Sequence, residues 1–277
     1  MDTREINIPN TFYSDRFDVE DTSSLSLFLY NTCLSILAKN EAGAVIGSHL
    51  YSFSGASALA DIFSQDSLIN AKNTVGKLYV HNGHFCLVPG VLFDPSMRST
   101  YLNFIAQVED DHYEVFYEGV DSNNIQVVGA VEREVLMLLD NALPDLEVSH
   151  ASCLILSYLS GLKSHLLGQE LFVFAEQGHM YVVAFAGAEL RLFNRFPVNG
   201  EHDFLKYTFA VTHQLAFDRM YCRITILGDI SGTQVDVEVL KKYFKNIQTG
   251  VPYSNQTYSP GAEKFKETNL LEAFWTL

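Results

Sequence analysis

Two stretches of the chain repeat one pattern of hydrophobic and polar positions. Residues 27–51 and 171–195 each contain three short apolar runs, separated first by a polar turn and then by a glycine turn. Apolar runs of this length between turn residues are typical of a three-stranded meander. The pattern starts again 144 residues later, from Leu27 to Leu171, which indicates two related halves. The glycine turns fall at Gly43 and Gly187.

Each meander is followed by the same further elements. Hydrophobic residues recur at helical spacing after both of them, and a short apolar strand comes next, at residues 77–80 and 222–227. The repeated unit is therefore βββαβ, and a meander joined to a crossover helix predicts a mixed sheet with helices on its faces. The helical faces would be Ala58, Leu59, Ile62, Phe63 and Ile69 in the first half, and Phe204, Thr208, Val211 and Leu215 in the second.

The first half contains further elements before the second meander begins. Asp94-Pro95 predicts a helix start, because an acidic N-cap and a proline in the first turn favour one. Two strands are predicted near residues 113–118 and 125–131, followed by an amphipathic helix and by a buried linking helix within residues 150–167. The apolar face of the helix after Asp94 would be Met97, Tyr101, Phe104 and Ile105.

We expect two domains from this repeat. The first would comprise residues 1–149, and the second residues 150–277, with the linking helix at its start and a tail at its end. Residues 248–260 of the tail are rich in turn residues and predict an irregular connector. Apolar residues at helical spacing follow near residues 270–277, beside Trp275. So short a helix would pack on the chain's own body or, as the alternative, on a second copy or a protein partner.

Composition narrows the classes of function. The 277 residues include 18 Lys and Arg against 33 Asp and Glu, a formal net charge of −15, which repels nucleic-acid phosphates and anionic lipid headgroups. The N-terminus lacks the apolar region of a secretory signal, and no apolar stretch approaches the roughly 20 residues of a membrane span. We therefore expect a soluble cytoplasmic protein that neither binds nucleic acid nor inserts in a membrane.

Cysteines and histidines give little indication of a metal site. The four cysteines form no C-x-x-C pair and lie in apolar contexts, so buried free thiols are expected rather than zinc ligands. His81 and His84 flank an Asn-Gly turn and could hold a metal from opposite strands. The sequence offers no third ligand, and a solvated turn is the expected environment for both histidines. The cysteines are Cys33, Cys86, Cys153 and Cys222.

Longer segments of the chain resemble known families. NNIQVVGAVEREVLMLLDNALPDLEVSHASCLILSYL at residues 123–159 and AGAELRLFNRFPVNG at residues 186–200 are similar to segments of the pilus assembly protein PilM and of the secretion protein GspL. LVPGVLFDP at residues 87–95, with the YLNF that follows, resembles an uncharacterised bacterial family, domain of unknown function 3822. These resemblances imply an α/β protein with the actin-like ATPase (ribonuclease H-like) fold, in which two duplicated βββαβα subdomains have mixed sheets.

The resemblance also implies where a nucleotide would bind. In such proteins an Asp-x-Gly turn in each meander contacts the phosphates and supplies a carboxylate for Mg²⁺ or for the attacking water, and a glycine-rich turn covers the adenosine. The corresponding residues here are Asn31 and Thr32 in the first turn, Glu176, Gln177 and Gly178 in the second, and Gly228, Asp229, Ser231 and Gly232 in the third.

Two of these three turns depart from what phosphate chemistry requires. The first turn has neither Asp nor Gly, and Tyr30 would crowd the phosphate, while the second turn has one acid and one glycine at a different spacing. Loss of a metal carboxylate costs orders of magnitude in phosphoryl transfer. We therefore expect a non-catalytic pseudo-ATPase that binds or assembles with proteins and has no cofactor. The alternatives are an ATPase or small-molecule kinase that uses ATP with Mg²⁺, and a binder of another small ligand.

Overall fold

The computed structural model describes residues 9–72, 74–109, 111–121, 124–166, 168–176, 178–230 and 235–277. The chain divides into two compact units. Unit 1 contains the described residues up to Ser157, together with Gln256–Phe265 and Thr276–Leu277. Unit 2 contains Tyr158–Asn255 and Lys266–Trp275, so the C-terminal tail belongs in part to each unit.

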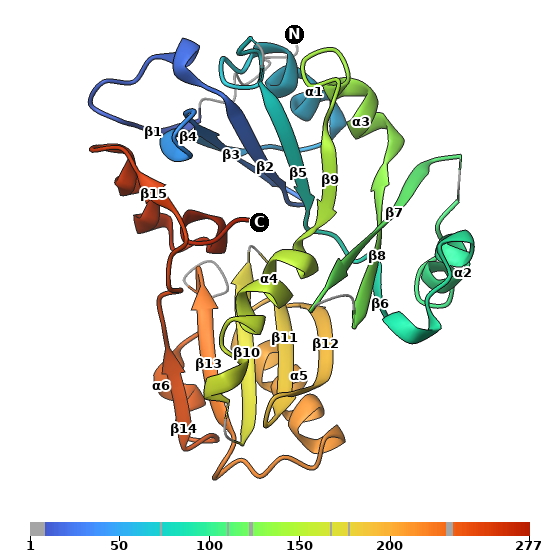
Figure 1. The fold of residues 1–277 in the computed structure, drawn as a ribbon. Coiled ribbons are helices and arrows are strands. Elements are labelled where there is room, and N and C mark those ends of the chain that lie inside the picture. Colours follow the sequence, from blue (N-terminus) through green and yellow to red (C-terminus); the bar gives the residue numbers. More distant parts are fainter. Residues whose placement is uncertain are drawn as a thin grey trace, which may run out of the picture. The chain divides into compact units, whose positions relative to one another are not determined.

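A seven-stranded mixed sheet forms the centre of unit 1 (Figure 1). Its strands follow the order β1-β4-β3-β2-β5-β9, and β15 pairs with β4. The meander of β2, β3 and β4 is antiparallel, as predicted, while β5 and β9 extend the sheet in parallel. The strands are β1 (Asn10–Tyr13), β2 (Ser24–Leu29), β3 (Cys33–Lys39), β4 (Ala44–Ser52), β5 (Val75–Val80), β9 (Glu147–His150) and β15 (Thr257–Tyr258).

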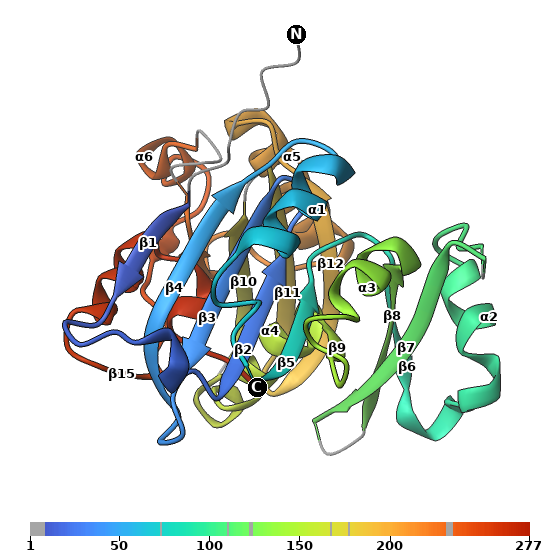
Figure 2. The same ribbon diagram turned by 90° about the horizontal axis from the view of Figure 1, so that it is seen from above.

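Two helices, α1 (Ala56–Gln65) and α3 (Arg133–Leu139), cover one face of this sheet (Figure 2). The crossover from β4 to β5 runs through α1, whose Leu59, Ile62 and Phe63 are buried. The crossover helix predicted from hydrophobic spacing is therefore confirmed. The core between the helices and the sheet uses alternate strand residues, because successive side chains of a strand point to opposite faces. They include Leu25, Leu27, Leu34, Ile36 and Leu78.

Unit 1 also contains a small inserted part, which we call the α2 subdomain. Its three strands form an antiparallel sheet in the order β6-β8-β7. The short helix α2 packs on this sheet, and Leu102, Val115 and Val128 are buried between them. The elements are β6 (Phe85–Pro89), α2 (Arg98–Asn103), β7 (Tyr113–Val120) and β8 (Ile125–Glu132).

The helix start predicted at Asp94 is confirmed, although the helix itself is short. The Asp94 carboxylate accepts a hydrogen bond from Ser96 N at 2.9 Å, and a 3-10 helix (Pro95–Met97) then leads into α2. The predicted apolar face of this helix is wrong, because α2 ends at Asn103. Leu102 is the buried residue of α2, whereas Met97, Phe104 and Ile105 are exposed.

Unit 2 repeats the strand order of unit 1. Its strands follow the order β12-β11-β10-β13-β14, which corresponds position by position to β4-β3-β2-β5-β9. The meander is again antiparallel and the two later strands are parallel. The predicted pair of duplicated βββαβα subdomains with mixed sheets is therefore confirmed. The elements are β10 (Gln169–Glu176), β11 (His179–Ala186), β12 (Glu189–Pro197), α5 (Glu201–Gln214), β13 (Arg223–Gly228), α6 (Val237–Leu240) and β14 (Asn246–Thr249).

The buried linking helix is present but shorter than predicted. Helix α4 (Ala151–Ser160) follows β9 directly, and Cys153, Leu154 and Leu159 are among its buried residues. A 3-10 helix (Lys163–His165) comes after it. The division of the chain into residues 1–149 and 150–277 stays a prediction.

The C-terminal tail differs from the prediction in its secondary structure. Strand β15 lies within the stretch expected to be irregular, and two 3-10 helices (Ala262–Thr268 and Leu271–Ala273) replace the predicted α-helix. Asn269 between them has a φ of 57°. This left-handed conformation ends a right-handed helix, so hydrophobic spacing alone could not produce one here.

The hydrophobic side chains of the tail are nevertheless packed within the chain. In unit 1 the buried Phe265 contacts the Phe12 ring at a centroid distance of 5.5 Å. In unit 2 Trp275 packs edge-on against the rings of Tyr158 and Tyr253. The expectation that the tail packs on the chain's own body is therefore confirmed for these side chains.

Two expectations from composition also bear on the fold. Cys33, Cys153 and Cys222 are buried free thiols, as predicted, whereas Cys86 is only half-buried. Burial raises the pKa of the Cys222 thiol to about 12. Within the described residues, no helix combines the length and the hydrophobicity needed to cross a bilayer.

Candidate functional site

The first meander turn, between β2 and β3, has its aromatic residue folded inward. Tyr30 N donates a hydrogen bond to Cys33 O at 2.9 Å and closes the turn. The Tyr30 ring lies over the His81 ring, with centroids 3.9 Å apart, and both residues are buried. His81 follows β5, the parallel neighbour of β2, so the rings meet where two parallel strands end. The predicted ligand residues Asn31 and Thr32 are exposed.

A cavity of about 220 Å³ lies beside this turn within unit 1. The carboxyl ends of parallel strands are a common place for ligands in α/β proteins. This cavity is smaller than the roughly 300–1,000 Å³ of most ligand pockets. Two of its polar residues, Glu132 and Glu134, carry negative charge that repels phosphate groups. Its lining includes Asn31, Phe53, Leu59, His81, Asn82 and Val135.

The second turn, between β10 and β11 in unit 2, holds its carboxylate against an arginine. Arg195 Nε lies 3.5 Å from Glu176 Oε2, and each of the two side chains is only 7% exposed. Arg195 is on β12, directly opposite Tyr181 of β11, and its guanidinium lies 5.6 Å from the centre of the buried Tyr181 ring. The Glu176 carboxylate therefore already has a buried cationic partner within its own sheet.

The electrostatic effect of this pair reaches its aromatic neighbour. Burial raises the pKa of the Tyr181 hydroxyl well above its ordinary value, and the Glu176 charge raises it further. The Arg195 charge acts in the opposite direction but does not cancel the effect. Tyr181 is consequently a protonated hydroxyl at neutral pH and does not supply a second negative group to the turn. Gly178 in this turn has a φ of 69°, while Gln177 lies outside the described residues.

The third predicted turn follows β13 and lies beside the second. Gly228 pairs with Ala175 across the parallel strands, and a Cβ atom at Gly228 would lie 2.3 Å from the Ala175 carbonyl oxygen. The glycine is therefore required for close packing between β13 and β10. Asp229 is half-buried, and Ser231 and Gly232 lie outside the described residues. The second and third turns thus meet in unit 2, whereas Asn31 and Thr32 belong to unit 1.

These turns differ from a Mg²⁺ and phosphate site in their charges. Such a site needs carboxylates available to the hydrated metal and backbone amides that approach the phosphate oxygens. The first turn supplies no carboxylate, and the carboxylate of the second is neutralised by Arg195. Among the described residues, no group of three or more His, Cys, Asp or Glu side chains is arranged to hold a metal ion. The first two turns therefore provide a single carboxylate, that of Glu176, and it lies 3.5 Å from Arg195.

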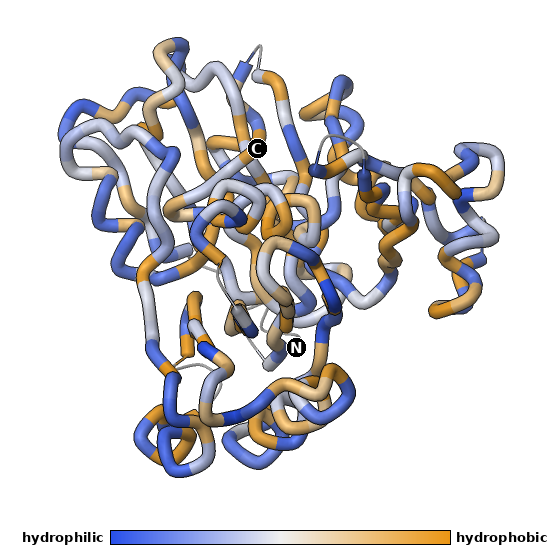
Figure 3. The backbone as a smooth tube through the Cα atoms, turned by 60° about the horizontal axis from the view of Figure 1, so that its bottom comes forward, coloured by the Kyte–Doolittle hydropathy of each residue, from blue (hydrophilic) through white to orange (hydrophobic). Residues whose placement is uncertain are grey.

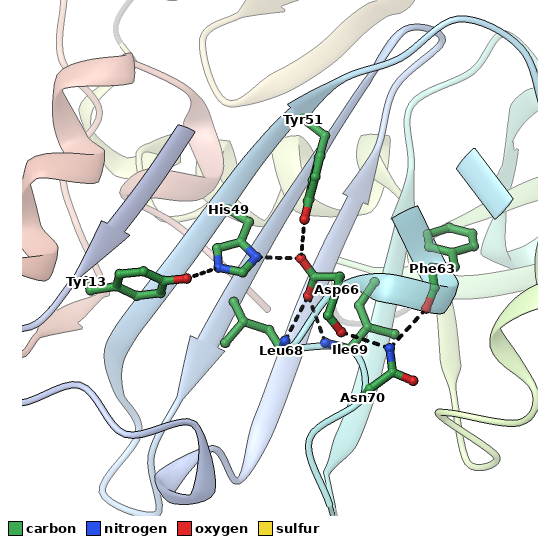
Figure 4. A network of polar contacts seen from close by, with 8 residues as sticks. All are labelled: Tyr13, His49, Tyr51, Phe63, Asp66, Leu68, Ile69 and Asn70. Atoms are coloured by element: carbon green, nitrogen blue, oxygen red, sulfur yellow. Dashed lines mark hydrogen bonds and ion pairs between the residues drawn. The ribbon is translucent and has the colours of Figure 1, made fainter. Parts of the chain in front are cut away.

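A second polar cluster lies in unit 1 (Figure 4). The Tyr13 hydroxyl contacts His49 Nε2 at 2.5 Å, and His49 Nδ1 contacts Asp66 Oδ2 at 2.5 Å. Hydroxyl, imidazole and carboxylate follow the order of a nucleophilic triad. Burial raises the pKa of Tyr13, however, and the Asp66 charge raises it further, so this hydroxyl is not an activated nucleophile. None of the three residues lines the cavity beside Tyr30.

The contacts of Asp66 explain what this cluster does. Its second oxygen accepts hydrogen bonds from Leu68 N at 2.8 Å and Ile69 N at 3.0 Å, and the Tyr51 hydroxyl donates to Oδ2 at 2.7 Å. Burial by itself would raise the pKa of Asp66, but the hydrogen bond and charge of His49, together with the other donors, lower it overall. Asp66 therefore joins the end of α1 to β4 and β1, and the cluster is structural.

The environment predicted for the histidine pair is wrong for His81. His81 is buried under Tyr30 and lies beside the cavity, instead of on a solvated turn. Asn82 makes the local contacts of the turn, since its amide donates to Ala130 O and its Oδ1 accepts from His84 N. His84 is half-buried against Tyr113, and burial lowers its pKa. The Asn-Gly signal located the turn correctly but did not indicate that Tyr30 covers His81.

The comparison with protein families is decisive for the lineage of the chain. A family described as "Protein of unknown function (DUF3822)" matches residues 16–247. The chain belongs to this family. The match confirms the resemblance to this family seen at residues 87–95, and it extends over most of the chain. No curated protein matches its sequence.

Solved structures similar to this DUF3822 protein share its fold. A protein of unknown function with an actin-like ATPase fold from Bacteroides thetaiotaomicron has a TM-score of 0.74 at 16% identity, covering 84% of this chain and 92% of its own. PilM from the PilM–PilN type IV pilus biogenesis complex has a TM-score of 0.59 at 13% identity, covering 91% and 96%. Similarity at such low identity establishes fold alone, and the predicted actin-like ATPase fold is confirmed.

Proposed function

We propose that this DUF3822 protein is a non-catalytic, protein-binding member of the actin-like ATPase fold. The observation that carries the proposal is the Glu176–Arg195 pair. A carboxylate that is to orient water or hold hydrated Mg²⁺ must be available to solvent and to the metal. Here the only acid of the second turn, Glu176, lies 3.5 Å from the Arg195 guanidinium, and each side chain is only 7% exposed. Entry of a metal would leave that arginine without its partner.

The first turn also supports a non-catalytic protein, because Tyr30 fills the space where a phosphate would bind. Tyr30 lies folded over His81 at the ends of β2 and β5, where the phosphate of a nucleotide would need small residues and free amides. The neighbouring cavity is small, and Glu132 and Glu134 in its lining disfavour an anionic ligand. Asn31, Thr32, Gly178, Gly228 and Asp229 would then be structural remnants of nucleotide-binding turns.

A protein partner is supported by one structural neighbour. The solved PilM structure is a complex with PilN, so the fold of this chain is one that a protein-binding component also uses. We propose that the DUF3822 protein acts in the bacterial cytoplasm and binds another protein. The described hydrophobic residues of the tail are mainly buried within the chain, and this burial supports a partner surface elsewhere on the molecule.

Calorimetry with Mg·ATP tests the proposal directly. We expect no measurable heat of binding from Mg·ATP, Mg·ADP or Mg·GTP at concentrations up to about 1 mM. This result would mean that the free energy of binding is weaker than about −4 kcal/mol. A dissociation constant in the low micromolar range, about −8 kcal/mol, would overturn the pseudo-ATPase assignment. If binding were observed, its loss in Thr32→Ala and its retention in Thr268→Ala would locate the nucleotide at the first turn.

A further inference from the structure

Exposed hydrophobic side chains are concentrated on the α2 subdomain. Among the described residues, fifteen large hydrophobic side chains are exposed, and six of them lie within residues 91–117. Val91 is 93% exposed and Phe104 is 81% exposed, which is unusual for residues of this size. In Figure 3, hydrophobic stretches interrupt the hydrophilic ones along the part of the tube that carries α2. The six residues, which we call the α2 surface, are Val91, Leu92, Met97, Phe104, Ile105 and Tyr117.

The α2 surface is not needed for the core of the subdomain. That core is already filled by other residues of the same elements, with Leu102 on α2 and Val115 on β7 buried against Val128 on β8. Exposed hydrophobic residues scattered singly over a protein have no special meaning, but a concentration of them marks an interaction surface. The residues of the α2 surface are therefore surplus to folding and are available to a partner.

Hydrogen bonds and ring contacts hold the backbone beneath this surface in place. The Tyr101 hydroxyl donates to Leu92 O at 3.0 Å and accepts from Asp94 N at 3.0 Å, which ties the loop before α2 to the helix. The centroids of the Phe93 and Tyr117 rings are 4.9 Å apart, so this contact links the loop to β7. A surface that is fixed before binding loses less conformational freedom when a partner docks.

Charge decides what kind of partner suits the α2 surface. Residues 90–118 contain one arginine, Arg98, whose Nε donates to Val115 O. The same stretch contains six acidic residues, within a chain of net charge −15. Glu114 is paired with Arg133 at 2.7 Å and Glu118 lies 3.6 Å from Lys77, so the excess of negative charge rests on the other four. Such a surface repels anionic lipids and a second copy of itself, and attracts a segment with Lys or Arg. The acidic residues are Asp94, Glu109, Asp110, Asp111, Glu114 and Glu118.

We infer that the α2 surface binds a segment of a partner protein that has hydrophobic residues beside basic ones. The inference rests on the proposed function, because it assigns a surface and a partner chemistry to the protein-binding activity. Hydrophobic residues of the partner would be buried against Leu92, Phe104 and Ile105. Its basic residues would pair with exposed acids of the subdomain, of which Asp94 and Glu109 are two.

Fluorescence anisotropy with two designed peptides tests the inference. The probes are a labelled amphipathic peptide of leucine and lysine, about 14 residues long, and the same peptide with glutamate in place of lysine. At about 0.15 M salt, where long-range attraction between charges is screened, we expect the leucine–lysine peptide to bind the full-length protein and the glutamate version not to bind. The double variant Leu92→Ser, Phe104→Ser should bind the lysine peptide at least about tenfold more weakly.

A matched variant separates this surface from hydrophobic exposure in general. Met220→Ser, Tyr221→Ser removes two exposed hydrophobic side chains from unit 2 and should leave peptide affinity unchanged. Equal loss of binding in both double variants, or no loss in either, would overturn the inference. Circular dichroism and the melting temperature should stay unchanged in both variants, since the substituted side chains are exposed.

Two further outcomes would contradict the inference, either by assigning the α2 surface to a dimer contact or by showing that it binds neither peptide. If sedimentation shows a dimer of the unaltered protein that Leu92→Ser, Phe104→Ser converts to a monomer, the occupant is a second copy and the inference is wrong. If neither peptide binds, the inference also fails, while an absence of Mg·ATP binding still leaves the proposed function standing. Tight binding of Mg·ATP would overturn the proposed function, whether or not either peptide binds.

Discussion

The Glu176–Arg195 contact shows how two residues can change the chemistry of an inherited turn. An isolated carboxylate at the end of β10 would be free to bind a cation. With Arg195 beside it on the same sheet, its charge is compensated where solvent barely reaches. Removal of one member of such a pair leaves the other as an uncompensated buried charge, which is more costly than removal of both.

Arg195→Ala should therefore destabilise the protein strongly. We expect the free energy of unfolding to fall by about 3–5 kcal/mol, as measured by urea denaturation, because Glu176 is left buried without its partner. The double variant Arg195→Met, Glu176→Gln should recover much of that loss. Arg191→Ala is the control on the same strand, since Arg191 pairs with Glu189 at an exposed position and should cost less than about 1 kcal/mol. Similar costs for the two arginine variants would contradict this account.

The sequence located the turns of the candidate site, but it did not reveal what surrounds them. Glu176 and Gly178 are recognisable as a meander turn from local pattern alone. Its partner Arg195 is nineteen residues away in sequence, and their meeting depends on the β11–β12 register, which shifts between Ala184 and Phe185. The burial of His81 likewise depends on Tyr30, which lies in the turn after β2, far from His81 in sequence. Contacts across strands are tertiary, so neither could follow from spacing along the chain.

At the scale of elements, the Asp66 cluster connects three parts of unit 1. Asp66 caps the end of α1 and accepts a hydrogen bond from the Tyr51 hydroxyl on β4. Through His49, it is also connected to Tyr13 on the edge strand β1. Because β1 pairs with β4 over only four residue pairs, the side-chain contact of Tyr13 gives this short edge strand a second attachment. The sequence pattern did not predict β1, since Asn10–Tyr13 lacks a run of apolar residues.

The lowered pKa of Asp66 predicts an acid-sensitive contribution to stability. A carboxyl whose folded pKa lies below its unfolded value stabilises the protein above the unfolded value, about 3.9, and loses that contribution as pH falls through the folded value. Asp66→Asn should therefore lower the free energy of unfolding by more than about 2 kcal/mol at pH 7. The difference from the unaltered protein should shrink below about pH 4.

Urea titrations at a series of pH values measure this difference. Asp61→Asn on the same helix serves as the control and should change stability by less than about 0.5 kcal/mol. A difference between Asp66→Asn and the unaltered protein that stays constant down to pH 2 would show that the charge of Asp66 contributes nothing.

At the scale of the whole molecule, the duplicated halves were predictable and the path of the tail was not. Turn residues and alternating apolar runs define both meanders locally, whereas β9, with the sequence Glu147–His150, is too polar to be recognised before its pairing with β5 is known. The tail contributes β15 to the sheet of unit 1 and Trp275 to unit 2. Its two 3-10 helices are separated by Asn269 in a left-handed conformation, which hydrophobic periodicity does not reveal.

Phe265→Ala tests whether the tail completes unit 1. The variant should lose about 3–5 kcal/mol of stability, the usual cost of removing a fully buried phenylalanine. Hydrogen exchange measured by mass spectrometry should show faster exchange in β1 and β4, which the tail contacts through Phe12 and β15. Leu277→Ala removes a side chain that is exposed and is expected to cost less than about 1 kcal/mol. Unchanged exchange in β1 and β4 would mean that unit 1 is complete without Phe265.

The parallel pairing of β15 with β4 has a consequence for synthesis on the ribosome. Unit 1 emerges first, but the strand that pairs with Ala44 and Val45 is made only after Tyr158–Asn255. At roughly 5–20 residues per second, translation of those residues takes about 5–20 s. During that time part of the β4 edge has no partner in the nascent chain, and an open strand edge can pair with another chain. The half that is translated first is therefore the half that is finished last.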